Sequence, residues 1–251
     1  MKLKNVVLFK PTKELFVVIG LMIFCWIFNF IADIFRGTYW FYLLYEGVFA
    51  LGICISLPMI FTTIKMKRPI STIGLKTSNW KKALLIGIAI SSFAFIGRMM
   101  GIKIEISTIQ HFISIIICMM FSTLFEEIFF RGFLQSSFED FFGIIPAILL
   151  SGICFALYHS AQSFIGFDLQ QLTTLFFVGL VFSISYQLTR NIITSYIVNL
   201  PQAILTFMGD SEFVEYGKDI NYVSAIICSI SIIVAIYLII YFNKLYKIKL
   251  N

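Results

Sequence analysis

The chain has 251 residues, of which 59% are hydrophobic and 13% charged, and its formal net charge is +6. Soluble domains carry about 25% charged residues, so an ordinary soluble protein is excluded. Apolar runs of about 20 residues recur along the chain, and each can cross a hydrocarbon core of about 30 Å. Because these runs are continuous and do not alternate with period two, a transmembrane β-barrel is also excluded. The composition predicts an all-α, polytopic transmembrane helix bundle.

About eight spanning helices are expected, in a single membrane domain that covers residues 1–251. In chain order, the apolar runs occupy residues 15–35, 39–64, 80–102, 109–138, 143–164, 172–189, 192–208 and 221–243. An even number of crossings places both termini on the same side of the membrane. The connecting segments are mostly short, so their Lys and Arg residues set the orientation.

Basic residues concentrate on the side of the termini. Fourteen of the 19 lie there: Lys2, Lys4, Lys10, Lys13, Lys65, Lys67, Arg68, Lys76, Lys81, Lys82, Arg190, Lys244, Lys247 and Lys249. The positive-inside rule therefore predicts cytoplasmic termini and places the acidic segment 210–219 outside, as a solvated loop. The same lysines meet anionic headgroups, which explains the net charge. We expect membrane lipid as a partner and no nucleic acid.

The cysteines give no sign of a metal site. All five lie inside apolar runs, where we interpret them as core or lipid-facing residues: Cys25, Cys54, Cys118, Cys154 and Cys228. The sequence contains no Cys-x-x-Cys motif and no His-rich tract. Neither a metal nor another cofactor is expected.

A short set of polar residues inside the apolar runs is left once the orienting charges are set aside. A charge at the centre of a spanning helix costs about 2.5–3.5 kcal/mol, so such residues usually face the bundle interior and have a function. For Glu46, a packing or interfacial hydrogen bond is the favoured role. The other residues of the set are candidate functional residues. The set is Glu46, Glu126, Glu127, Arg131, His159, Asn199 and Gln202.

The two adjacent glutamates differ in their expected partners. Glu127 and Arg131 are four residues apart, which places them on one helix face and predicts an ion pair. Glu126 lies about 100° round the helix and has no partner at helical spacing. Glu126 is therefore the free carboxylate of the two, and it could act as a general base.

His159 is expected to lie level with Glu126. Two antiparallel helices joined by a tight turn place residues equidistant from the turn at the same depth. The midpoint between the two residues falls at Phe142 and Gly143, next to the best turn signal, 139–143. Glu126 and His159 should therefore face each other near the middle of the bilayer.

Three interpretations fit these residues. A carboxylate and an imidazole could activate a water for hydrolysis. A buried Glu–Arg–His network could instead only fix the packing of the helices. Intramembrane carboxylates also serve proton or ion transport, although the two halves of the chain lack the paired broken helices typical of transporters. The residues alone leave these alternatives open.

Three motifs resemble, in order and spacing, those of the CPBP family, the CAAX-protease and bacteriocin-processing group also called Abi. The similarity covers about residues 70–210 and includes a short segment that precedes the core helices. The motifs are Ile73-Gly74-Leu75-Lys76 with Trp80, Glu126-Glu127-x-x-x-Arg131 with Gly132-Phe133-Leu134, and Phe155-x-x-x-His159.

The resemblance implies an intramembrane endopeptidase in which Glu126 activates water and His159 assists, with Glu127 and Arg131 as a supporting pair. It implies a peptide or lipid-anchored protein as substrate, for which a prenylated protein is one possibility. The chain has no His-Glu-x-x-His motif and only two histidines, so a metal-free mechanism is favoured. The expected location is a cell membrane, with a composition that suggests a bacterium. The oligomeric state is not predicted.

The third motif of the family departs from its usual form. Family members commonly carry His followed by Asn three or four residues later, whereas this chain has Asn199 and Gln202. The two amides share a helix face, and either could donate a hydrogen bond to a developing oxyanion. Neither side chain titrates. A catalytically silent protein of the same fold, acting in bacteriocin self-immunity or as a binding partner, is therefore the alternative.

Overall fold

The computed structural model describes residues 6–99, 108–162, 168–209 and 220–248. All regular structure in these ranges is helical, which confirms the all-α prediction. The predicted ends at residues 102 and 164 and the acidic segment 210–219 lie outside the described residues. Apolar helices with continuous hydrophobic runs of this length belong to an integral membrane protein.

The described helices form rods that follow the predicted spans in order. The first three are α1 (Lys13–Asp33), a second rod from Tyr39 to Lys65, and α4 (Trp80–Met99). The second rod consists of α2 (Tyr39–Tyr42), η1 (Leu43–Ser56), α3 (Leu57–Ile60) and η2 (Phe61–Lys65). A 3₁₀ turn, η3 (Ile70–Ile73), lies between this rod and α4.

The remaining rods carry the candidate motifs. The fourth consists of α5 (Ile109–Glu126), η4 (Glu127–Gln135) and α6 (Ser136–Phe142). It is followed by α7 (Ile144–His159), α8 (Leu169–Thr189), α9 (Ile192–Gly209) and α11 (Tyr222–Ile248). Among the described residues, five rods are long and apolar enough to cross a membrane, namely α1, the second and fourth rods, α8 and α11. Eight crossings therefore stay a prediction.

The fourth rod differs from its expected form in two ways. It continues to Phe142, so the predicted turn shortens to Gly143, whose φ of +86° suits a residue without Cβ. Its middle section, η4, is a π-helix, and so is most of the second rod. The i to i+5 hydrogen bonding of a π-helix is rare, and it is frequent at functional sites. Neither π-helical section was expected.

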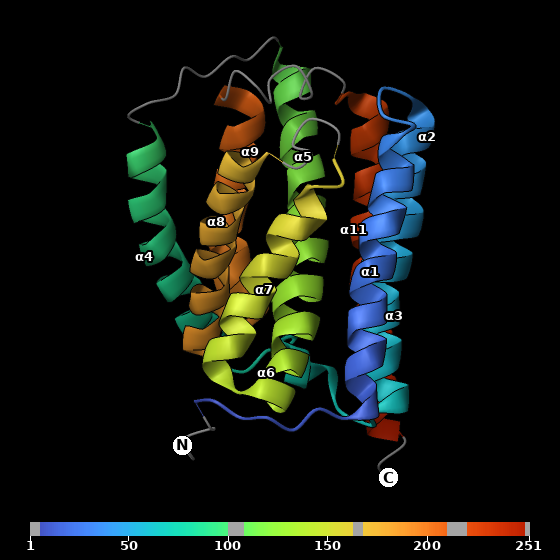
Figure 1. Cartoon of the computed structure of the whole chain (residues 1–251). Coiled ribbons are helices and arrows are strands. Elements are labelled where there is room, and N and C mark those ends of the chain that lie inside the picture. The colour runs from blue at the N-terminus through green and yellow to red at the C-terminus, as the bar shows by residue number, and fades with distance from the viewer. Residues whose placement is uncertain (1–5, 100–107, 163–167, 210–219, 249–251) are drawn as a thin grey trace.

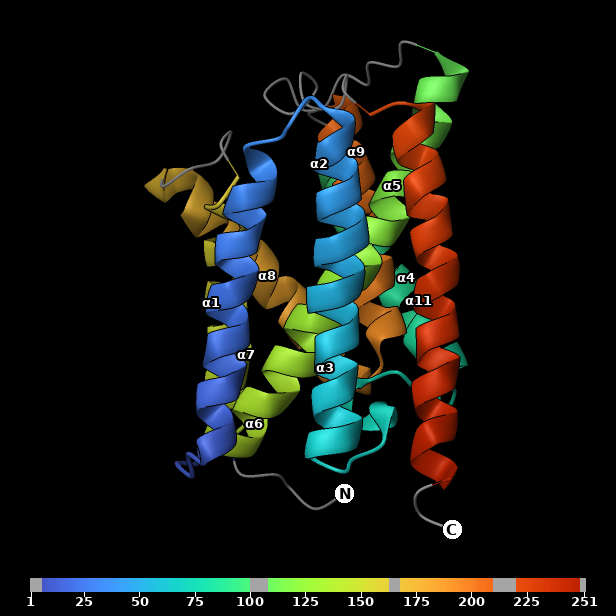
Figure 2. The same cartoon turned by 90° about the vertical axis from the view of Figure 1, so that its right-hand side faces the viewer.

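The bundle has two distinct ends (Figures 1 and 2). The start of α1, the end of α11 and the Gly143 turn lie at one end, here called the terminal end. The connection from α1 to α2 and the starts of α5 and α8 lie at the other, the distal end. The start of α1 and the end of α11 thus lie on the same side of the bundle, as an even number of crossings requires. The cytoplasmic location of the terminal end stays a prediction.

Close packing between α7 and α8 depends on glycine. A Cβ at Gly179 would lie 3.1 Å from the Gly152 Cα, tighter than most real Cβ contacts. Two facing glycines let the backbones of two apolar helices approach, which is how helices associate in a membrane without a hydrophobic driving force. This contact holds α7, and with it His159, against the rest of the bundle.

Candidate active site

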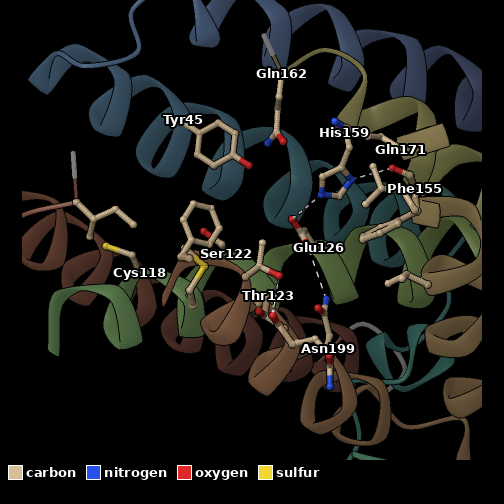
Figure 3. Close-up of a pocket in the computed structure, with 18 of the residues that line it drawn as sticks. Tyr45, Cys118, Ser122, Thr123, Glu126, Phe155, His159, Gln162, Gln171 and Asn199 are labelled. Atoms are coloured by element: carbon tan, nitrogen blue, oxygen red, sulfur yellow. Dashed lines mark hydrogen bonds and ion pairs between the residues drawn. The ribbon is translucent and has the colours of Figure 1, made fainter. Parts of the chain in front are cut away.

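Glu126 and His159 face each other across the Gly143 turn. Glu126 is the last residue of α5 and His159 the last of α7. The Glu126 Oε1 and His159 Nε2 atoms are 3.8 Å apart, and the side chains are 13% and 14% exposed (Figure 3). The predicted meeting of the two residues is confirmed. The separation is too long for a direct hydrogen bond but leaves both atoms within reach of one water.

The backbone fixes the tautomer of His159. Its Nδ1 atom lies 2.9 Å from the carbonyl oxygen of Phe155, one turn earlier on α7. A carbonyl oxygen can only accept, so Nδ1 carries the hydrogen. In the neutral ring, Nε2 then presents a lone pair toward Glu126, and it is ready to take a proton there.

Glu127 and Arg131 form the predicted ion pair behind the dyad. Both side chains are fully buried, with Arg131 Nε 3.6 Å from Glu127 Oε2. Arg131 Nη1 donates to Ser151 Oγ at 2.9 Å, and Ser151 donates to the Phe130 carbonyl at 3.1 Å. The guanidinium carbon lies 4.9 Å from the centre of the Phe155 ring. The pair is therefore held by α7 as well as by its own helix.

Asn199 links the two glutamates. Its Nδ2 atom lies 2.9 Å from Glu127 Oε1 and 3.5 Å from Glu126 Oε2. The Asn199 amide nitrogen is therefore already engaged by the two carboxyl groups, and the service of an oxyanion by an amide of the third motif stays a prediction. Gln202 differs: its Nε2 is buried and has no hydrogen-bond partner within the described part of the chain. Gln202 is the donor that a ligand could use.

A cavity of about 460 Å³ adjoins the dyad. Glu126, His159, Asn199 and Gln202 all line it. The fully buried Glu127 and Arg131 lie behind this wall. The six predicted site residues thus divide into four that face the cavity and two that support them.

Glu46 supplies another carboxyl group to the cavity wall. It is buried on η1 and accepts a hydrogen bond from Ser122 Oγ at 3.1 Å. Ser122 precedes Glu126 by four residues on α5, so Glu46 lies about one helical turn from the dyad. The expected packing hydrogen bond of Glu46 is confirmed, and Glu46 also lines the cavity.

Several residues of this site were not expected from the sequence. Ser151, which holds Arg131, and the cavity-lining Gln162, Gln170 and Gln171 carry no motif. Polar residues that lie in or beside apolar runs were the available signal, but serine and glutamine are common enough there to pass unnoticed. Only the packing of α7 and α8 around α5 brings them to the site.

Side chains that could bind a metal ion are not grouped in threes within the part of the chain that the structure describes. His111, the second histidine, lies at the start of α5, where its Nδ1 is 3.0 Å from the Ile220 carbonyl oxygen. Across the residues that the structure describes, no three His, Cys, Asp or Glu side chains are grouped closely enough to hold a metal ion. Independence from metal stays a prediction for experiment.

Comparison with known families identifies the segment that carries this geometry. Residues 108–200 match the model of a family described as type II CAAX prenyl endopeptidase Rce1-like. This matched segment, somewhat more than a third of the chain, is similar to that family. The predicted resemblance to the CPBP family is confirmed, and the Rce1-like segment contains Glu126, His159 and Asn199. It ends two residues before Gln202. No curated protein matches the chain.

Proposed function

We propose that the chain is an intramembrane endopeptidase that hydrolyses a peptide bond with water activated by Glu126. The observation that carries this proposal is the Glu126–His159 pair at the wall of a cavity, within an Rce1-like segment. The family that matches this segment is described as prenyl endopeptidases. The substrate class proposed for this chain is a membrane-associated, secreted or lipid-anchored peptide, and the setting a bacterial cell membrane.

In the proposed reaction, a water lies within reach of Glu126 Oε1 and His159 Nε2. The Glu126 carboxylate takes a proton as the water oxygen attacks the scissile carbonyl carbon. The carbonyl oxygen becomes an oxyanion, to which Gln202 Nε2 donates. His159 Nε2 receives this proton from Glu126 and passes it to the leaving amine as the C–N bond breaks, which returns Glu126 to its carboxylate form. Glu126 therefore acts as the general base, and His159 carries the proton to the leaving group.

The supporting residues keep Glu126 in position. Asn199 donates to both glutamates, and Arg131 faces Glu127. Glu127 is thereby held between the Asn199 amide and the Arg131 guanidinium. Glu126 keeps one oxygen, Oε1, directed toward His159. In this assignment Glu127, Arg131 and Asn199 are positioning residues, whereas Glu126, His159 and Gln202 touch the reacting atoms.

The alternative function is a catalytically silent protein of the same fold, acting by binding, as in bacteriocin self-immunity. One observation favours it: Asn199 stands where family members commonly have histidine. With Asn199 committed to the glutamates, the described site holds a single imidazole near Glu126.

The deciding experiment uses the purified full chain in lipid nanodiscs and a broad peptide library. Wild type should cleave, and Glu126→Gln and His159→Ala should lose about 10²- to 10⁴-fold in rate, the usual contribution of a general acid–base group. Glu46→Gln is the matched control, because it makes the same change at a carboxyl group of the same cavity. Cleavage by Glu126→Gln at the wild-type rate, or no cleavage by wild type, contradicts the endopeptidase. Retained immunity in Glu126→Gln supports the silent alternative.

A further inference from the structure

The lining residues of the cavity extend from the dyad toward one end of the bundle. Its buried wall includes Asn199 and Glu46. Its exposed wall includes Gly37, Asp168 and Gln170. Gly37 lies in the connection from α1 to α2, and Gln170 lies in the first turn of α8. Both places are at the distal end (Figures 1 and 2). The dyad is therefore reached from the distal end.

The path from the dyad to the terminal end is filled. All nine residues of η4, which continues from Glu126 toward the Gly143 turn, are buried. Four of them are large side chains with at most 1% exposure: Phe129, Phe130, Arg131 and Phe133. Phe130 also contacts the Tyr158 ring, with centroids 5.2 Å apart. A polypeptide could not pass this layer without unpacking the core.

Besides the ionisable Arg36, Glu46 and Asp168, the cavity wall carries neutral hydrogen-bonding side chains, including Gln162 and Gln171. Figure 3 shows the Gln162 amide pointing into the space between Tyr45 and His159. Gln171 also lines the cavity, and its Oε1 atom is buried with no hydrogen-bond partner among the described residues. A buried acceptor without a donor is costly, so a ligand N–H that reaches Gln171 gains that hydrogen bond. Carboxamides match the alternating N–H and C=O groups of a peptide backbone.

We propose that the cavity admits an extended polypeptide segment from the distal end, and that Gln171 accepts a hydrogen bond from its backbone. The cleavage of that segment rests on the proposed endopeptidase function, whereas its binding does not. With the predicted orientation, the distal end is extracytoplasmic. The substrate class is then a secreted or surface-exposed peptide, and not a prenylated C-terminus presented from the cytoplasm.

The direction of access is tested by cysteine labelling of the full chain in a bacterial membrane. Gln170→Cys lies at the cavity mouth, and Thr77→Cys is an exposed control at the terminal end. A membrane-impermeant maleimide should label Gln170→Cys in intact cells and Thr77→Cys only in inverted vesicles. Wild type, with its native thiols, gives the background. Labelling of Gln170→Cys only in inverted vesicles overturns the extracytoplasmic substrate.

The role of Gln171 is tested by binding, independently of cleavage. The probe is a dye-labelled alanine–leucine peptide with blocked termini, added to Glu126→Gln protein in nanodiscs. Adding Gln171→Met, which keeps the length but removes the acceptor, should weaken binding about tenfold, as expected for one neutral hydrogen bond and its unpaired partner. Thr173→Ala is the control, since Thr173 is exposed on α8 and bonds only its own helix at Leu169.

The outcomes separate this inference from the proposed function. Binding that depends on Gln171, without cleavage by wild type, supports the peptide site and contradicts the endopeptidase. Cleavage by wild type with equal probe binding by Gln171→Met and its parent contradicts the role of Gln171 alone. Absence of probe binding to Glu126→Gln overturns backbone recognition. Attachment of a bulky maleimide to Gln170→Cys should also slow probe binding, because it narrows the mouth.

Discussion

The side-chain amide of Asn199 lies 2.9 Å from Glu127 Oε1, so α9 is tied to the start of η4 by a buried hydrogen bond. The same nitrogen lies 3.5 Å from Glu126 Oε2. Asn199 thus forms a bridge between two carboxyl groups. Its loss should affect folding and cleavage together.

Asn199→Leu keeps the approximate volume but removes the donor. The free energy of unfolding should fall by about 1–3 kcal/mol, because Glu127 loses a buried partner. Asn199→Asp should be worse, since it adds a third carboxyl group beside two others. Thermal unfolding in nanodiscs measures the loss of stability of each variant, and a peptide cleavage assay measures the loss of activity. Equal stability of Asn199→Asp and wild type contradicts the bridge.

Arg131→Met should leave Glu127 as a buried charge without its counterion. Removing one partner of a buried pair typically costs about 3–5 kcal/mol. Adding Glu127→Gln should recover a large part of that loss, because the uncompensated carboxylate disappears. A double-mutant cycle from chemical unfolding gives the coupling. Additive losses would show that the two side chains do not interact.

The α7–α8 contact can be tested by replacing glycine with alanine at Gly179 and, as a control, at Gly20 on α1. Gly179→Ala introduces a methyl group against Gly152 and should destabilise the bundle by about 1–3 kcal/mol, the usual cost of overpacking. Gly20→Ala on α1 meets nothing within 4 Å and should be neutral or slightly stabilising. Thermal unfolding of both variants compares them directly. Equal midpoints contradict the close approach of α7 and α8.

Two pairs of thiols report on helix neighbours. Cys118 and Cys228 have sulfur atoms 3.4 Å apart, and Cys25 and Cys54 have theirs 3.8 Å apart. A membrane-permeant oxidant should join α5 to α11 and α1 to η1 through these residues, since only a small movement reaches the S–S bond length of about 2.05 Å. Proteolysis and mass spectrometry identify the linked peptides. A link from either pair to Cys154 would contradict the arrangement.

Cleavage is expected to survive a chelator. The proposed chemistry uses Glu126 and His159 alone to handle the water and its protons. Activity should be unchanged after incubation with a strong chelator, measured with the peptide that wild type cleaves best. A zinc protease treated in parallel gives the positive control. Loss of activity that added zinc restores would replace the metal-free mechanism.

Much of the site follows from local regularities. Glu126 and His159 lie equidistant from Gly143, so two antiparallel helices bring them level whatever surrounds them. Glu127 and Arg131 lie four residues apart, so their pairing needs only a helix. The apolar runs predict the helical rods and their sequence along the chain. A run that crosses a membrane must form a helix, because only then are its backbone N–H and C=O groups hydrogen-bonded within the segment.

The remaining features depend on packing between helices far apart in the sequence. Ser151 reaches Arg131 only because η4 and α7 pack together, and Gln171 reaches the cavity only because α8 returns beside the dyad. The commitment of Asn199 to the glutamates depends on the depth of α9 relative to α5. The side from which the cavity opens follows from the buried residues of η4. The sequence by itself determined the helices and the pairing of Glu126 with His159, whereas the tertiary structure decided which amides are already bonded and which face the cavity. Hydrogen bonds between distant helices have no fixed spacing along the chain.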